Sequence, residues 1–207
     1  METLQATTKL NALTQGLKEH YVPTMPQAFV PHAEEAVRKL EDLEFPTTKQ
    51  EYWKYTRTGL IANKNWKFAD NFDLPELPLS IEELKPRMVF VNGKFKPEHS
   101  HLEGFNGVEI TEFSKCNRGY IPEVEPYVNY KKSPFYALNT ALPQNGYAIR
   151  VSKNTIVENA VNIINVYTGD TTISQPRSTV VVEQNAALKL TEFHIHMGDA
   201  PTFSNAV

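Results

Sequence analysis

The spacing of apolar residues is helical in the first part of the chain and strand-like in the last part. In the first part it repeats at steps of three and four, which places on one helix face Ala6, Leu10, Leu13, Leu17 and Tyr21. The segment 31–45 predicts a second helix with Ala33, Val37 and Leu40 on one face. We therefore expect a helical N-terminal domain, 1–63.

A third helix is expected from Thr48 to about Ala62. Thr48 and Glu51 have the spacing of a capping box, in which the hydroxyl accepts a hydrogen bond from a free backbone N–H and the carboxylate bonds back to the cap residue. Pro46 stops any preceding helix.

The middle of the chain, 64–130, is expected to be a linker with one β-hairpin. Residues 63–87 are rich in Pro, Asp and Asn, which is typical of a loop. In the segment 87–97, Asn92 and Gly93 adopt positive φ at low cost, and β-forming residues flank them. This arrangement predicts a hairpin.

The last part, 131–207, begins with a short helix and continues as strands. Ser133 as cap, Pro134 at the first helical position and Pro143 after the end predict the helix. Strand-forming runs follow at 147–151, 155–157, 161–169, 178–184 and 186–198. Turn residues recur about every ten residues, which indicates a sandwich, a barrel or a solenoid.

A weak internal repeat favours the solenoid. Segment 157–170 resembles segment 182–199, with an offset of 25 residues at the start and 29 at the Gly-Asp turn. A stack of coils needs a cap over its last apolar layer, but the segment 199–207 has the pattern of a new strand. We therefore expect either a piece of a longer protein or an open end that pairs with another chain.

Composition narrows the class of protein. The chain has 207 residues and a formal net charge of −3, so it has no basic surface typical of nucleic-acid or anionic-membrane binding. The sequence has no apolar run of membrane-spanning length and no secretory signal. A single cysteine, Cys116, excludes an internal disulfide and suits a reducing compartment. We expect a cytoplasmic protein.

The strongest candidates for chemistry lie in one strand. Alternation places Glu192, His194 and His196 on one face, where they can bind a divalent metal with Asp199 as a fourth ligand. The alternative is a strand with its apolar side in the core and its polar side in water. Cys116 lacks a neighbouring His or second Cys, so we interpret it as structural.

Aromatic residues crowd an otherwise polar stretch: Tyr52, Trp53 and Tyr55, followed by Trp66 and Phe68. They can form a stacking platform for bases or sugars, but the acidic chain argues against nucleic acid. We favour a packing contact between helices and a neighbouring sheet, since aromatic side chains bury a large area.

Several segments resemble the SufD branch of the SufB/SufD family, subunits of the SufB–SufC–SufD iron–sulfur cluster assembly complex. They are FPTTKQEYWKYT at 45–56, VFVNGKF at 89–95, SPFYALNTAL at 133–142 and the strand repeat at 175–190. They occur in the family's order over nearly the whole chain. SufB has a different N-terminal region, so 45–56 favours SufD.

The resemblance implies an α+β chain: an N-terminal helical domain followed by a mostly β region, the first coils of a right-handed parallel β-helix. Family members run to about twice this length, so the chain would be a truncated fragment, the N-terminal half. The region that docks on the ATPase SufC would lie beyond Val207. No cofactor is expected on this chain, since the cluster is handled by the intact complex, and no catalytic, cofactor or metal residue is carried over.

We therefore expect a non-catalytic scaffold subunit, not an enzyme, that acts through contacts with SufB-like and SufC-like partners. It would neither bind nucleic acid nor insert in a membrane, and it would self-associate through the open end. One alternative is a cupin-like metal-binding protein that uses His194 and His196. Another is a β-helix that binds or cleaves polysaccharide. Nucleophile elbows, phosphate-binding loops and carboxylate pairs are missing from the sequence.

Overall fold

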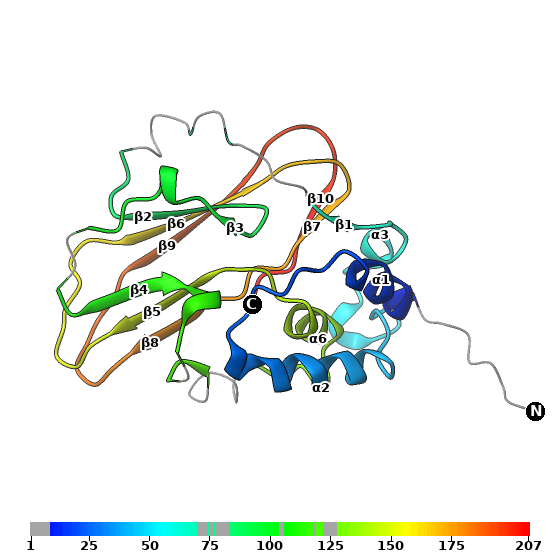
Figure 1. Cartoon of the computed structure of the whole chain (residues 1–207). Helices are drawn as coiled ribbons and strands as arrows, with labels where there is room; N and C mark the ends of the chain where they lie inside the picture. The colour runs from blue at the N-terminus through cyan, green and yellow to red at the C-terminus, as the bar shows by residue number, and fades with distance from the viewer. Residues whose placement is uncertain are drawn as a thin grey trace, which may run out of the picture.

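A computed structural model describes residues 9–69, 74, 77, 83–103, 106–117, 119–121 and 128–207. Its described helices gather at one end of three sheets (Figure 1). They are α1 (Lys9–Lys18), α2 (Val30–Leu40), α3 (Gly59–Ala62) and α6 (Pro134–Ala141), with 3-10 turns at Gln27–Phe29, Glu51–Trp53, Pro97–His99 and Phe113–Lys115. The coarse α+β class is therefore confirmed.

The helix expected from Thr48 to about Ala62 is wrong. The chain makes one 3-10 turn at Glu51–Trp53 and helix α3 is only four residues long. Thr48 does not cap either element, and the hydroxyl of Thr58 donates to the carbonyl oxygen of Pro46. That bond gives the local backbone an alternative to a continuous helix, and Gly59 is a poor helix former.

The other two N-terminal helices and the hairpin are confirmed. Helix α2 buries Ala33, Ala36 and Leu40, and α1 begins at Lys9, so Ala6 lies outside the described residues. In the hairpin, Asn92 and Gly93 have φ of 48° and 78° between antiparallel strands. Both angles suit a two-residue hairpin turn, whose twist matches that of the strands.

Helix α6 also begins where the sequence predicts. The hydroxyl of Ser133 accepts a hydrogen bond of 3.4 Å from the backbone N–H of Tyr136, and Pro134 occupies the first turn. This cap fixes the start of a helix whose side chains from Ala137 to Ala141 are all buried. Helix α6 is therefore the central helix of the group that gathers at one end of the sheets.

Three sheets contain the described strands. The first has the order β1-β7-β10, the second β3-β2-β6-β9 and the third β4-β5-β8. The strands are β1 (Lys67–Phe68), β2 (Arg87–Val91), β3 (Lys94–Phe95), β4 (Val108–Glu112), β5 (Tyr147–Val151), β6 (Val161–Tyr167), β7 (Thr172–Ser174), β8 (Thr179–Val182), β9 (Leu190–His196) and β10 (Thr202–Ser204).

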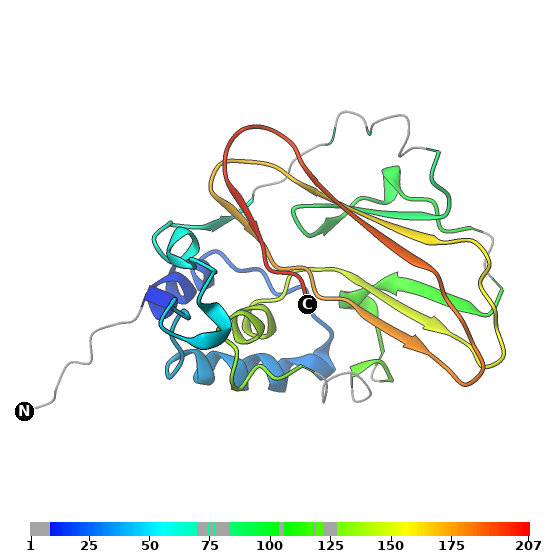
Figure 2. The same cartoon turned by 180° about the vertical axis from the view of Figure 1, so that it is seen from behind.

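The last six strands visit the three sheets twice in the same order. Strands β5, β6 and β7 form one layer, and β8, β9 and β10 pair with them in parallel as a second layer. Figure 2 shows the connections β6–β7 and β9–β10 following the same path. Aligned residues of the two layers lie 31 positions apart in the third sheet, 29 in the second and 30 in the first.

This register corrects the internal repeat seen in the sequence. The offset of 29 is right in the second sheet, where Tyr167 aligns with His196. The offset of 25 is wrong: Val182 aligns with Val151, and the N–H of Val157 bonds to the carbonyl of Ala187 at 2.9 Å. Chance similarity of short apolar runs produced the smaller offset.

The segment 64–130 is more than a linker with a hairpin. It contributes β1 to the first sheet, β2 and β3 to the second and β4 to the third. Strand β2 pairs in parallel with β6, and β4 pairs antiparallel with β5. Pairing between strands this far apart in sequence leaves no local pattern, so the sequence showed only the hairpin. The division of the chain at 63 and 130 stays a prediction.

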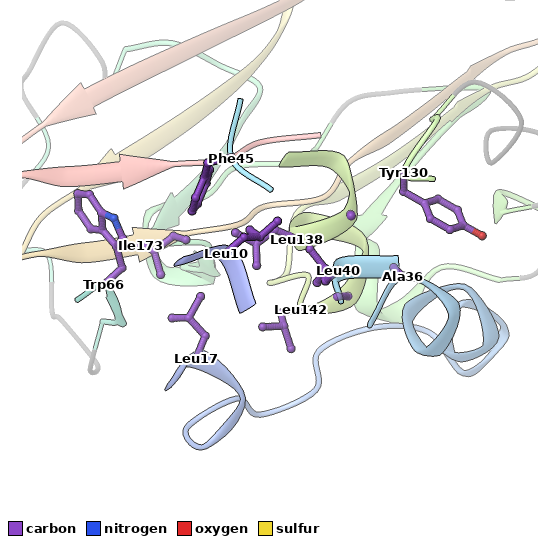
Figure 3. Close-up of a cluster of buried hydrophobic side chains, with 12 residues drawn as sticks. Leu10, Leu17, Ala36, Leu40, Phe45, Trp66, Tyr130, Leu138, Leu142 and Ile173 are labelled. Atoms are coloured by element: carbon purple, nitrogen blue, oxygen red, sulfur yellow. The ribbon is translucent and has the colours of Figure 1, made fainter. Parts of the chain in front are cut away.

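The helices pack on α6 through one apolar cluster (Figure 3). Leu10 and Leu17 come from α1, Leu40 from α2 and Leu138 from α6, and each is at most 1 % exposed. Ile173 of β7 joins the same cluster and is fully buried. The helical end and the strand layers therefore share a core.

Candidate functional site: the inner face of the last strand layer

The polar row Glu192, His194 and His196 lies where alternation predicts, but its face is the inner one. In the second sheet, Glu192 aligns with Ile163, which is fully buried in the cluster between the second and third sheets. Residues aligned in parallel strands point to the same side. The polar row therefore continues an apolar interior.

The apolar side of strand β9 faces the other way. Phe193, Ile195 and Met197 pack against a cluster on the outer face of the second sheet, which includes Leu74 and Leu77. The alternation inferred from the sequence is confirmed. The alternative expected from the sequence, with the apolar side in a core and the polar side exposed, also agrees with the structure, because Phe193, Ile195 and Met197 pack on this core cluster while Glu192, His194 and His196 are exposed.

Two tyrosines hold the polar row in place. The hydroxyl of Tyr147, on β5 of the third sheet, donates to Glu192 Oε1 at 2.8 Å. The hydroxyl of Tyr167, on β6, lies 2.8 Å from His194 Nδ1, and the two rings stack with centroids 5.8 Å apart. Ser204 on β10 donates to the Tyr167 hydroxyl at 3.0 Å. The network thus joins all three sheets.

Burial keeps both phenols protonated. It raises the pKa of Tyr147, and the nearby charge of Glu192 raises it further. Burial likewise raises the pKa of Tyr167, although the hydrogen bond from Ser204 opposes this. Glu192 Oε2 lies 3.8 Å from His194 Nε2. These phenols act as fixed hydrogen-bond donors and acceptors rather than as acids.

A hollow of about 210 Å³ opens beside the network. Tyr147, Asn165, Ser178, Val180 and Glu192 line part of it. The second layer therefore has accessible hydrogen-bonding groups on its inner face.

The structure does not favour a metal at this row. Within the described part of the chain, no group of three or more His, Cys, Asp or Glu residues is placed to hold a metal ion. Asp199 follows the strand at a Gly-Asp turn and is not gathered with His194 and His196. The cupin-like alternative therefore gains no geometric support.

Cys116 lies in an apolar cluster with Phe29, Phe113 and Tyr120, and it is 6 % exposed. Burial raises the pKa of its thiol to about 11. A protonated, covered thiol is a poor nucleophile. This environment agrees with a structural role.

The aromatic cluster divides into two parts. Trp53 contacts Phe135 of α6 with ring centroids 5.4 Å apart, and Trp66 contacts Phe203 of β10 at 5.6 Å. These rings form the packing contact that the sequence favoured. Tyr52 and Tyr55 instead are 99 % and 91 % exposed.

Tyr147, Tyr167 and Ser204 were not predicted from the sequence as partners of the polar row. Each is one polar residue in an apolar or turn-rich strand, and only the alignment of β5, β6 and β10 brings them to the polar row. The internal repeat could have pointed to Tyr167, because Tyr167 in the first copy aligns with His196 in the second copy.

Comparison with known proteins identifies the family. A family model described as the SufBD protein N-terminal region matches residues 5–163. A search of curated proteins found no match. None of the described helices has the length and apolar character needed to cross a membrane. The chain belongs to the SufBD protein family, which takes part in iron–sulfur cluster assembly within the Suf complex.

Proposed function

We propose that this chain is a non-catalytic, SufD-like scaffold subunit of cytoplasmic iron–sulfur cluster assembly, and that it acts through contacts with other proteins. The segment 45–56 favours SufD over SufB, because its FPTTKQEYWKYT motif resembles the SufD branch. The two strand layers fit the first coils of a right-handed parallel β-helix.

One observation carries the proposal: the second strand layer leaves apolar interior uncovered. Val180 and Val182 of β8 align with Ile149 and Val151, which are fully buried. Val180 and Val182 are themselves 36 % and 44 % exposed. Apolar residues that extend a core and remain accessible indicate a surface that another layer of protein covers.

The backbone of the same layer is also free on one side. Strands β8, β9 and β10 are each the last strand of their sheet among the described residues. The outward N–H and C=O groups of such strands pair readily with further strands. We call this surface, made of the three strands and their inward side chains, the free edge.

The free edge combines protein-binding features without a catalytic set. Its valines offer apolar area, and Glu192 and His194 offer hydrogen bonds held in place by Tyr147 and Tyr167. Interfaces of this kind bury an apolar centre within a polar rim. Further strands, from the same polypeptide or from a SufB-like subunit, are the occupants that fit.

Co-purification tests the proposal. Tagged chain is co-expressed with SufB-like and SufC-like proteins and isolated without oxygen, and we expect all three to elute together. In a chain that carries Val180→Lys and Val182→Lys, charges at the free edge should abolish recovery of the SufB-like partner. Ile156→Lys, at an exposed position between β5 and β6, is the matched control and should retain the partner. Absence of both partners from the unaltered chain would refute the scaffold role.

A further inference from the structure

The segment 44–67, which we call the basic segment, has a charge opposite to that of the whole chain. It contains two acids, Glu44 and Glu51, and five cations, Lys49, Lys54, Arg57, Lys64 and Lys67. Its formal charge is therefore +3 in a chain of net charge −3. Figure 2 shows the segment, drawn largely in cyan, at the end of the molecule where the helices gather. A local excess of one sign attracts charges of the other sign.

Buried neighbours fix the backbone of the basic segment. The rings of Trp53 and Phe45 pack on Phe135 of α6, with centroids 5.4 Å and 5.8 Å from its ring. The hydroxyl of Thr58 donates to the carbonyl oxygen of Pro46 and ties the two ends of the turn together. Side chains exposed on a fixed backbone lose less conformational freedom when they bind a partner.

The winding of the backbone brings Tyr52 and Tyr55 to one outer side. Three backbone hydrogen bonds between residues three apart lie within 50–56. Residues three apart share a side in such 3-10 turns, so the two tyrosines lie together while Trp53 points to Phe135. Tyr52 and Tyr55 are 99 % and 91 % exposed. Aromatic side chains on a fixed backbone are typical anchors of protein interfaces.

Two cations accompany the tyrosines. Lys54 Nζ lies 5.6 Å from the centroid of the Tyr55 ring, and Arg57 follows two residues later. Both cations are exposed, and no ion pair among the described residues involves either of them. They are therefore accessible to carboxylates of another molecule, which a guanidinium can bind through two parallel N–H bonds.

A hollow of about 450 Å³ lies beside Arg57. Its walls come from the start of α1, from the residues that precede the 3-10 turn and from α3. Phe45 and Pro46 line it with apolar surface, and the cations Lys9 and Arg57 outnumber the one acid of its described lining, Glu44. The hollow can therefore accept an apolar side chain next to a carboxylate.

The charge of the remaining chain favours an acidic protein segment over a nucleic acid. Because the basic segment holds +3 of a total of −3, the rest of the chain has a formal charge of −6. A nucleic acid has one negative charge at each phosphate, so it would extend beyond the basic segment and meet acidic surface. A peptide with a few carboxylates can bind within the segment alone.

We propose that the basic segment is a docking site for an acidic, partly apolar peptide segment of a partner protein. Carboxylates of the peptide pair with Lys54 and Arg57. Its apolar side chains pack on Tyr52 and Tyr55 and enter the hollow. The site shares no residue with the free edge, so the two surfaces can be tested independently.

Fluorescence anisotropy of a labelled peptide tests the proposal on the purified chain. The probe is a soluble peptide in which Glu alternates with Leu and Ser. We expect saturable binding that weakens at least about tenfold when Gln replaces Glu in the peptide or Ser replaces Leu. Binding should also weaken as salt is raised, because exposed charge pairs are screened.

Variants of the chain locate the site. Arg57→Glu should weaken binding about tenfold or more, since it removes a charge-assisted contact and adds repulsion. Lys189→Glu, the same change of charge at an exposed position before β9, is the matched control and should bind within about twofold of the unaltered chain. Tyr52→Ala should weaken binding about tenfold with an unchanged urea midpoint, whereas Ile156→Ala, also at an exposed position, should leave binding unchanged.

Four results would overturn the proposal. The first is no saturable binding of the acidic peptide up to about 1 mM. The second is equal binding of the Gln peptide, which would exclude a role for the cations. The third is equal weakening by Arg57→Glu and Lys189→Glu, which would indicate non-specific attraction by surface charge. The fourth is tighter binding of oligothymidylate that Tyr52→Ala weakens, which would identify a nucleic-acid site instead. Circular dichroism of the variants establishes that they are folded.

Discussion

The hydroxyl of Tyr147 donates a 2.8 Å hydrogen bond to Glu192 Oε1 and thereby joins strand β5 of the first layer to strand β9 of the second. The two residues belong to different sheets and are 45 positions apart in sequence. The bond crosses the interior between the sheets. The bond can therefore form only when strand β9 of the second layer lies in place across from strand β5.

Removing this bond should destabilise the second layer. We expect Tyr147→Phe to lower the free energy of unfolding by about 1 kcal/mol, because a hydrogen bond to a carboxylate is lost and Glu192 stays partly solvated. Urea unfolding followed by circular dichroism measures the change. Tyr136→Phe is the control, because Tyr136 is 44 % exposed and its hydroxyl makes no described hydrogen bond. Equal stability of the two variants would contradict the assigned role.

Close approach of the layers at Gly146 gives a second prediction. A Cβ at Gly146 would lie 2.2 Å from the carbonyl oxygen of Arg177, so the backbones before β5 and β8 would have to separate. We expect Gly146→Ala to cost more than about 3 kcal/mol or to prevent folding, as strained core changes do. Thermal unfolding measures the loss.

Gly16 is the matched control for Gly146. It lies within helix α1, and an added Cβ would meet nothing within 4 Å. Gly16→Ala should therefore raise stability by about 0.5–1 kcal/mol through helix propensity. If Gly146→Ala left the melting temperature unchanged or raised it, as Gly16→Ala should, the close approach at Gly146 would be wrong.

The sequence predicts an element well when neighbouring residues determine it, and poorly when distant segments determine it. Helix α1 and the hairpin at Asn92 and Gly93 follow from local spacing and turn chemistry, so they were predictable. Parallel pairing of β2 with β6 joins distant segments and leaves no local pattern. The same holds for the candidate site, where the sequence placed Glu192 and His194 on one face but did not reveal their tyrosine partners.

The divided aromatic cluster gives a third prediction. Trp53 packs on Phe135, whereas its neighbour Tyr52 is 99 % exposed. We expect Trp53→Ala to lower the free energy of unfolding by about 1–3 kcal/mol through lost apolar contact. Tyr52→Ala should change it by less than about 0.5 kcal/mol. Urea titration of both variants decides, and a larger loss for Tyr52→Ala would reverse the assignment.

The buried thiol predicts a pH dependence. The pKa of Cys116 is raised to about 11, above the 9.0 of an exposed thiol. Below about pH 9 the thiol is protonated in both states, but between about pH 9 and 11 only the unfolded chain loses the proton. Stability should therefore fall as pH rises through this window, by less than about 3 kcal/mol. The measurement is the difference in urea midpoint between pH 8 and pH 10, which should be smaller in Cys116→Ala because other titrating groups are unchanged.

The free edge predicts self-association of the isolated chain. The N–H of Met197 bonds to Tyr167 on β6, so by alternation the N–H of His196 points outward. Outward groups on β9, next to the exposed Val180 and Val182, allow two copies to pair edge to edge. We expect the apparent mass from light scattering to increase over a tenfold range of concentration.

His196→Pro separates edge pairing from other contacts. Proline removes only an outward donor at this position, so the variant should fold yet remain monomeric across the same range. Ile195→Pro is the contrasting variant, because its N–H points toward β6 and its loss should destabilise the sheet itself. A monomeric unaltered chain, or a His196→Pro variant that associates as strongly as the unaltered chain, would show that the free edge does not template pairing.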